Sequence, residues 1–293
     1  MTTTGILTRA DLRAQGLGDA QIRTLVRRGT VTRLREGWYA QAAADPQVVR
    51  AVQAGGVLTC VSALSTAGSG ILVAPPWIPP HQGLHVRFPS NSRRAISALG
   101  RGDLVAHRLS RAAGTPRCPA DSLSHALASA VTCLSSAEWV AVTDSVLRQG
   151  ISPDELMADI LAADPSLLRS LTKLMARTSR LSESGTESLL RHDLVSARLR
   201  VRAQVWIGSD RVDLLVGDRL VLECDSRAHH TRLDRYTADR LRDQRLTALG
   251  FHVLRFTYHQ LVHDRSSVLA LVLDLTRSGV HLSGRVHRVE SAS

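Results

Sequence analysis

The chain has 293 residues, 44% of them hydrophobic, and a mean hydropathy of −0.03. Such a chain can bury two ordinary cores, so we expect a soluble protein of two or three domains. The formal net charge is +11, and Lys173 is the only lysine among 37 basic residues. Arginine matches phosphate geometry and stays charged, so nucleic acid is favoured over a membrane surface as partner. Codon bias is an alternative explanation of the arginine-to-lysine ratio, but not of the net charge.

Cysteine and histidine spacing argues against a metal or disulfide framework. The sequence contains no CxxC pair, so neither a zinc site nor disulfides are indicated for Cys60, Cys118, Cys133 and Cys224. Four histidines also have no ligand-like spacing, and we interpret each as a surface or satisfied core residue: His81, His85, His107 and His125. The chain starts without a leader pattern and has no apolar run near about twenty residues. We therefore expect a reduced, cytoplasmic protein without membrane contact.

Residues 1–45 predict two helices followed by a hairpin. Thr8 and Asp11 form a capping box that opens a helix closed by Gly16, and a second helix runs over residues 19–29. Residues 31–35 and 38–40 then flank a short turn. Five arginines of this region are candidate nucleic-acid contacts: Arg23, Arg27, Arg28, Arg33 and Arg35.

The spacing of apolar and glycine residues in this region resembles the N-terminal domain of the AbiEi family of antitoxins. The resemblance covers about forty residues and rests on Leu7-Thr8, Leu12, Gly16, Ile22, Leu25-Val26, Gly29, Arg33-Leu34 and Gly37-Trp38-Tyr39. It implies a winged helix that docks on DNA. The alternative is a helical module that binds protein or packs on its neighbour. The spacing of the two helices does not distinguish this alternative from a DNA-binding winged helix.

Residues 46–180 are predicted to be mixed and mostly helical. A helix of small residues is expected over 58–69, strands over 84–88 and 104–107, and helix starts at Ser135, Ser152 and Asp164. The arrangement is similar to the segment that follows the winged helix in AbiEi-like proteins, which implies an adaptor or DNA-binding extension. We see no catalytic constellation in it.

Two short β-branched runs, residues 211–216 and 220–225, read as a hairpin. Side chains alternate along a strand, so Glu223 and Asp225 share one face, and a three-residue turn would place Asp213 opposite Glu223. At about 4 to 5 Å and an effective dielectric of about 20, each ionised pair repels by roughly 3 to 4 kcal/mol. A bound divalent cation would remove that cost.

Glu187 lies in the helix that precedes the hairpin and has two interpretations. It follows Ser184 at the spacing of a capping box. It also shares a helical face with Leu190 and Leu194, where a buried carboxylate without a partner is costly. A metal ion or a water held at the hairpin would then explain its position.

From residue 185 the predicted order is α, β, β, β, α, β. With its acids, this region resembles the PD-(D/E)XK nuclease superfamily, and specifically its branch like the very-short-patch-repair endonucleases. The resemblance spans roughly residues 183–264 and rests on Glu187, Gln204, Val212-Asp213, the run 222–225, His229, residues 239–243 and residues 250–257. It implies an α/β protein whose residues 181–280 form a restriction-endonuclease-like core, with a basic tail over 281–293.

The resemblance also implies roles for single residues. Asp213 and Glu223 would be the metal-binding acids, with the carbonyl of Cys224 as a further ligand, and hard oxygen donors suit Mg²⁺ or Mn²⁺. Asp225 is the departure, because the superfamily has lysine there. The lysine role could pass to one of three residues, between which the sequence does not decide: His229, His230 and Arg240. Two acids of the following helix could form an ion-pair ladder with neighbouring arginines; these are Asp239 and Asp243, with Arg240 and Arg242.

Two functions follow. The first is a DNA-binding, divalent-metal-dependent endonuclease in DNA repair, phage defence or toxin–antitoxin biology. The alternative is a catalytically inactive DNA-binding regulator or antitoxin that uses the nuclease-like fold as a scaffold. DNA is the expected partner, while a homodimer and a protein partner of the N-terminal region stay open.

Overall fold

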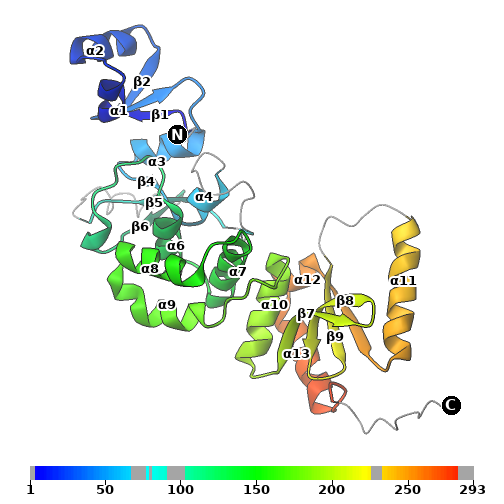
Figure 1. Cartoon of the computed structure of the whole chain (residues 1–293). Helices are drawn as coiled ribbons and strands as arrows, with labels where there is room; N and C mark the ends of the chain where they lie inside the picture. Colours follow the sequence, from blue (N-terminus) through cyan, green and yellow to red (C-terminus); the bar gives the residue numbers. More distant parts are fainter. Residues whose placement is uncertain (1–3, 67–76, 79–80, 91–102, 226–232, 283–293) are drawn as a thin grey trace, which may run out of the picture. The chain divides into compact units, whose positions relative to one another are not determined.

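The computed structural model of the protein describes residues 4–66, 77–78, 81–90, 103–225 and 233–282, with only the backbone course for 233–239. The chain forms two compact units (Figure 1). The first comprises Met1–Val146 and Gly150–Ala176, and the second Leu147–Gln149 and Arg177–Ser293. Within the described residues, no helix has both the length and the apolar character to cross a membrane.

The first residues of the first unit form the predicted helix, helix, hairpin order. The elements are β1 (Ile6–Thr8), α1 (Arg9–Ala14), α2 (Asp19–Arg27), β2 (Val31–Arg35) and β3 (Trp38–Gln41). The capping box is confirmed, because Thr8 Oγ1 accepts from the Asp11 N–H at 3.1 Å and the Asp11 carboxylate accepts from the Thr8 N–H at 2.7 Å. Strand β1, which the pattern did not predict, pairs with β3 in a sheet of order β1-β3-β2. That this region is a winged helix stays a prediction.

The rest of the first unit packs helices around a second small sheet. Its elements are α3 (Pro46–Gln53), β4 (Val57–Leu58), α4 (Cys60–Ser65), β5 (Leu84–Arg87), β6 (Leu104–His107), η2 (Arg111–Ala113), α6 (Leu123–Val131), α7 (Ser136–Leu147), α8 (Pro153–Ala163), η3 (Pro165–Leu167) and α9 (Leu168–Met175). The sheet has the order β4-β5-β6, with β5 and β6 parallel. The strands expected over 84–88 and 104–107 are confirmed. The helix expected from residue 58 was wrong at its start, because Val57 and Leu58 pair with β5 and α4 begins only at Cys60.

The second unit has the predicted αβββαβ order. Its elements are α10 (Gly185–Ser196), β7 (Val201–Ile207), β8 (Asp210–Val216), β9 (Leu220–Asp225), α11 (Leu233–Ala248) and β10 (His252–Thr257), followed by α12 (Tyr258–His263) and α13 (Arg265–Arg277). The sheet order is β10-β9-β8-β7, in which β10 runs parallel to β9 and the other pairs are antiparallel. Residues 283–293 of the predicted basic tail lie outside the described residues.

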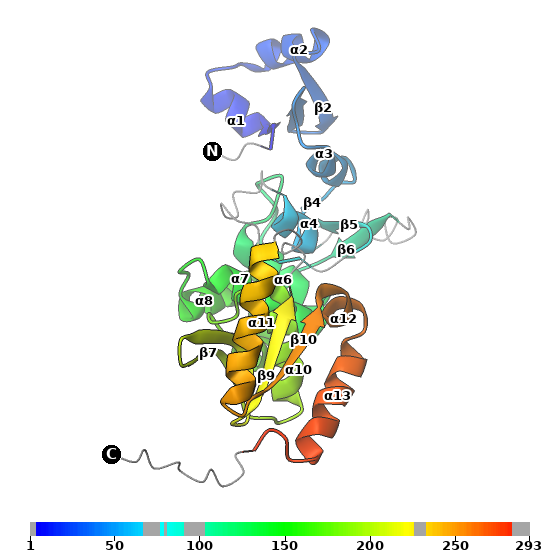
Figure 2. The ribbon, with the colours of Figure 1, turned by 90° about the vertical axis from the view of Figure 1, so that its right-hand side faces the viewer.

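Helices cover both faces of this sheet (Figures 1 and 2). On one face, Leu190 and Leu194 of α10 pack with Leu214 and Leu222 of the sheet, together with residues of α12 and α13. On the other face, Leu246 of α11 packs on the sheet side chains Val212, Leu215 and Val221. Apolar residues on both faces explain why β8 and β9 read as nearly continuous hydrophobic runs.

The β7–β8 ladder is interrupted at one position. Ala203 pairs with Leu214 and Val205 pairs with Val212, but the position between them, Gln204 opposite Asp213, is skipped. Gln204 has a φ of +54°, in the left-handed region that glycine favours. Alternation also fails here, because Ala203 packs on the α10 side of the sheet and Val205 on the α11 side. Such an irregularity re-aims side chains and is frequent beside functional sites.

Candidate functional site

Three carboxylates come from neighbouring elements around the interrupted ladder. Glu187 lies in the first turn of α10, Asp213 in β8 and Glu223 in β9. The last pairs of the β8–β9 hairpin are Leu214 with Leu222 and Val216 with Leu220, which confirms the three-residue turn. Asp213 and Glu223 are the next residues on the two strands, directly beyond the point where this pairing ends. Glu187 and Glu223 are 4% and 5% exposed, so neither carboxylate is a solvated surface group.

The side-chain amide of Gln204 links two of these acids. Its Nε2 donates to Glu187 Oε2 at 2.8 Å and to Asp213 Oδ1 at 3.4 Å. The backbone N–H of Cys224 donates to the other oxygen of Asp213 at 2.8 Å. Both oxygens of Asp213 thus have a fixed donor from a neighbouring strand, which orients the carboxylate.

The predicted capping box at Glu187 is present only in its serine half. The backbone N–H of Glu187 donates to Ser184 Oγ at 3.1 Å, as expected for a residue in the first turn after a serine cap. Its carboxylate, however, accepts from the N–H of Glu183 at 2.8 Å and from Gln204, rather than from the N–H of Ser184. Ser184 therefore caps α10, whereas the carboxylate of Glu187 binds the Glu183 N–H and the amide of Gln204.

Burial raises the pKa of all three carboxyl groups, and the charge of Asp213 adds to the rise at Glu187 and Glu223. Burial is the main cause at Glu187 and at Asp213. At Glu223, burial and then the charge of Asp213 raise the pKa to about 7, although Arg242 and Arg255 oppose the rise. Three acids that resist ionisation at one place favour a cation as their partner.

Two arginines lie beside Glu223. Arg242 of α11 donates to both oxygens of Glu223, at 2.9 and 3.3 Å. Arg255 of β10 is opposite Glu223 in the parallel ladder and donates to Asp243 at 2.8 Å. The expected ladder within α11 was therefore wrong for Arg242 and Asp243, because both side chains pair with strand residues; the Asp239 side chain lies outside the described residues.

Asp225 and the residues expected near it lie at the end of β9. The side chain of Asp225 is 49% exposed, and its carboxylate lies 3.7 Å from Nη1 of Arg255. Arg240 is exposed on α11, while His229 and His230 fall outside the described residues. The sequence did not indicate Arg255 as a partner of Asp225, because only the parallel register of β9 and β10 brings the two together.

Three arginines of the first unit line one hollow. Arg23, Arg27 and Arg33 surround a hollow of about 410 Å³ whose floor includes Ile22, Val26 and Tyr39. Arg28 is exposed. Arg35 instead donates to the carbonyls of Gly55 and Gly56, at 2.6 and 3.3 Å, and stacks over the Trp38 ring.

His85 and His107, predicted to be surface or satisfied core histidines, are buried and lie together with two cysteines, a grouping that the spacing did not indicate. The structure gathers their candidate ligand atoms within 4.8 Å of one another; the group is Cys60, His85, His107 and Cys133. No motif indicated this group, because the four residues come from separate segments of the chain and no two are spaced as in known ligand motifs.

The C-terminal unit matches a known family model. Residues 187–275 match REase_MTES_1575, a restriction endonuclease-like family. The matched region begins at Glu187 and ends in α13, so it contains Asp213, Glu223 and both arginines beside them. The match supports a nuclease domain at the C-terminus.

The remaining comparisons add little. No curated protein sequence matches the chain. Among solved structures, the chain is similar to the crystal structure of the RV2827C protein from Mycobacterium tuberculosis, with 19% identity over 64% of this chain and 76% of that chain. The TM-score is 0.29, too low to support an argument about the fold.

Proposed function

We propose that the C-terminal unit hydrolyses phosphodiester bonds of DNA with the help of a divalent metal ion. The observation that carries the proposal is the meeting of Glu187, Asp213 and Glu223 at the interrupted ladder, inside the region that matches a restriction endonuclease-like family. Buried acids with raised pKa values at a strained backbone position are typical of a functional site rather than of a structural core.

The donor set fits a hard divalent cation. Asp213 and Glu223 offer carboxylate oxygens from adjacent strands, which suit Mg²⁺ or Mn²⁺. A cation between them would also remove the repulsion that raises the pKa of Glu223. When bound by these acids, such an ion would polarise the scissile phosphate and lower the pKa of the attacking water.

The protein's own residues would orient the site and supply positive charge. Gln204 and the Cys224 N–H fix the two oxygens of Asp213, so this carboxylate needs little reorganisation to hold a ligand. Arg242 and Arg255 place guanidinium groups beside Glu223, in the neighbourhood where the superfamily has its lysine. Guanidinium groups recognise phosphate oxygens well, so these two arginines are our candidates for contacts to the DNA backbone.

The N-terminal arginines would hold the DNA without taking part in chemistry. Arg23 and Arg27 lie on one face of α2, and Arg33 of β2 joins them around the same hollow. A cluster of arginines on a helix and the adjacent hairpin suits phosphate contacts, which position a protein on DNA. The net charge of +11 points the same way.

A cleavage assay tests the catalytic part. The purified protein is incubated with supercoiled, linear and single-stranded DNA in Mn²⁺, Mg²⁺ or EDTA. We expect metal-dependent cleavage that Asp213→Asn abolishes. The matched control is Asp210→Asn on the same strand, since Asp210 pairs with Arg245 away from the three acids. Cleavage that survives in Asp213→Asn, or that proceeds in EDTA, would overturn the proposal.

A binding assay tests the N-terminal part separately. The double variant Arg23→Ala, Arg27→Ala should weaken DNA binding and flatten its dependence on salt, because fewer counterions are released. The control is Arg13→Ala, whose guanidinium already pairs with Asp19. Equal affinity and equal salt slope for the double variant would favour the protein-binding interpretation of this module.

A second candidate function is a DNA-binding regulator that has lost catalysis. Two observations favour it: Asp225 stands where the superfamily has lysine, and Arg242 already neutralises Glu223. Under this function the protein binds DNA with the salt dependence described above but cleaves none of the substrates with any metal. The two assays together therefore separate the candidates.

A further inference from the structure

Four potential metal ligands meet in the first unit, independently of the acidic site. The candidate ligand atoms of Cys60, His85, His107 and Cys133 all lie within 4.8 Å of one another. Nδ1 of His85 is 2.9 Å from Nε2 of His107 and 3.5 Å from Sγ of Cys133. Cys60 and His85 are fully buried, and His107 is 6% exposed.

The fold brings these residues together from four elements. β5 and β6 are parallel neighbours in which His107 stands opposite Arg87, two positions beyond His85. Side chains two positions apart share a face, so both imidazoles project from the same side of the sheet. Cys60 is the first residue of α4, and Cys133 follows α6.

The backbone holds Cys60 in an unusual conformation. Its φ is +51°, in the left-handed region that non-glycine residues rarely adopt. The segment is fixed on both sides, because the Thr59 N–H donates to the His85 carbonyl and the His85 N–H donates to Ser62 Oγ, each at 3.0 Å. Backbone strain of this kind persists where the surroundings impose it, and it clusters at ligand sites.

The chemistry of the cluster suits one particular cation. Zinc bonds of about 2.3 Å to sulfur and about 2.0 Å to nitrogen separate tetrahedral ligand atoms by roughly 3.3 to 3.8 Å. The 3.5 Å between Cys133 Sγ and His85 Nδ1 falls in this range, and the 2.9 Å between the imidazole nitrogens is slightly shorter. Two thiolates and two neutral imidazoles also cancel the charge of a divalent ion, which removes the cost of burying it. Thiolates exclude Mg²⁺, which prefers oxygen donors.

We propose that these four residues bind one zinc ion. Four protein donors complete a tetrahedral shell, which is the composition of a structural rather than a catalytic site. The ion joins α4, β5, β6 and the end of α6, segments that are far apart in the sequence. The stability of the first unit therefore depends on the metal.

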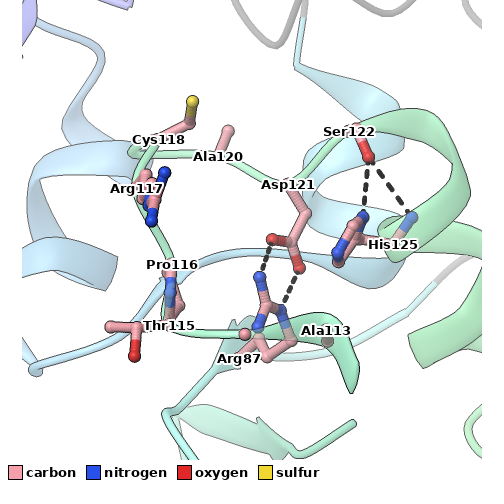
Figure 3. A pocket seen from close by; sticks show the side chains of 11 residues that line it. Arg87, Ala113, Thr115, Pro116, Arg117, Cys118, Ala120, Asp121, Ser122 and His125 are labelled. Carbon is pink, nitrogen blue, oxygen red and sulfur yellow. Dashed lines mark hydrogen bonds and ion pairs between the residues drawn. The ribbon is translucent and has the colours of Figure 1, made fainter. Parts of the chain in front are cut away.

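Arg87, on the same strand as His85, belongs to a buried ion pair. Figure 3 shows Arg87 in a two-point contact with Asp121, at 2.6 and 2.7 Å, on the wall of a hollow of about 430 Å³. Both side chains are buried, and each satisfies the other. Asp121 also ties its segment to β4, because its N–H donates to the Leu58 carbonyl at 2.8 Å. This ion pair braces the strand that precedes Cys60.

Metal analysis of the full-length protein tests the proposal. We expect one zinc per chain by native mass spectrometry in a buffer with reductant and without chelator. A strong chelator should remove the ion and lower the melting temperature by several degrees, and Zn²⁺ but not Mg²⁺ should restore it. Replacement by Co²⁺ should give the sulfur charge-transfer and d–d absorption of a tetrahedral site with thiolate ligands.

Matched variants locate the ion. Cys60→Ser and Cys133→Ser should lose bound zinc, whereas Cys118→Ser should keep it, since Cys118 is exposed and outside the cluster. Asp213→Asn should keep it too, which separates this site from the proposed nuclease centre. Wild-type protein that neither contains zinc nor gains stability from it, or that carries a disulfide between Cys60 and Cys133, would overturn the proposal, and this result does not depend on how the variants fold.

Discussion

The guanidinium of Arg242 lies against the carboxylate of Glu223 and donates to both of its oxygens, at 2.9 and 3.3 Å. The positively charged side chain of Arg242 is thus already bound to the carboxylate that we propose as a metal ligand. Among the described residues, the oxygens of the three carboxylates lie less close together than the ligand atoms of the cluster of Cys60, His85, His107 and Cys133. Metal binding at Glu223 must therefore compete with Arg242.

Removing the arginine should increase the response to metal. In Arg242→Gln, Glu223 loses a charged hydrogen-bond partner, which we expect to cost roughly 2 kcal/mol in EDTA. Added Mn²⁺ should raise the melting temperature of this variant more than that of the wild type. The control is Arg245→Gln on the same helix, because Arg245 pairs with Asp210 instead. An equal Mn²⁺ shift in variant and wild type would mean that the arginine and the ion do not compete.

Stability should depend on pH through Glu223. Its pKa in the folded protein is about 7, above the ordinary value of 4.5. Between these values the folded state binds more protons than the unfolded state, so stability falls as the pH rises through this window. A pKa difference of this size corresponds to roughly 3 kcal/mol.

The variant Glu223→Gln should lack this component. In EDTA, the melting temperature of the wild type, measured by calorimetry, should fall relative to that of Glu223→Gln as the pH rises from 4.5 to 7. Mn²⁺ should reverse the decline in the wild type alone, because the ion favours the ionised carboxylate. Parallel pH profiles of the two proteins in EDTA would show that Glu223 is not the group responsible.

Gln204 combines a strained backbone with a bridging amide, and two variants separate these roles. Both Gln204→Ala and Gln204→Gly remove the amide that donates to Glu187 and Asp213, so both should lose cleavage. Only glycine adopts a φ of +54° without cost. Gln204→Gly should therefore be more stable than Gln204→Ala by about 1 kcal/mol.

Denaturant unfolding and the cleavage assay measure the two effects independently. Equal stability of the glycine and alanine variants would show that the backbone at position 204 is not strained. Cleavage by either variant at the wild-type rate would show that the amide is not needed to orient Asp213.

The order of elements in the second unit could be predicted because local signals coincide there. The turn around Gly217 and the two short β-branched runs beside it predict the hairpin, and Ser184 marks the start of α10. The interruption at Gln204 could not be predicted. A left-handed glutamine has no local signature, and it arises from the way β7 and β8 pack on two different helical layers.

The same distinction applies to the sites. Asp213 and Glu223 were predictable as neighbours because they sit on one hairpin with a short turn. The partners of Glu223 and Asp225 were not, since Arg242 and Arg255 reach them through helix packing and a parallel strand pairing between segments far apart in sequence. His85 and His107 show the extreme case, because only the parallel register of β5 and β6 brings them together.

Asp225 should act through Arg255 rather than as a metal ligand. Its side chain lies at the exposed end of β9, 3.7 Å from a guanidinium that Asp243 holds from the other side at 2.8 Å. Asp225→Asn keeps the shape but removes the charge that helps to orient Arg255. We expect this variant to reduce the cleavage rate while leaving the Mn²⁺ affinity, measured by calorimetry, nearly unchanged.

A double-mutant cycle makes the assignment of Asp225 testable. If Asp225 works only by positioning Arg255, then Asp225→Asn should add no further loss of rate in an Arg255→Gln background, because the two changes remove one interaction. Asp243→Asn should lower the rate as well, since it releases the same guanidinium. A large loss of Mn²⁺ affinity in Asp225→Asn, or losses that multiply in the double variant, would show instead that Asp225 binds the ion directly.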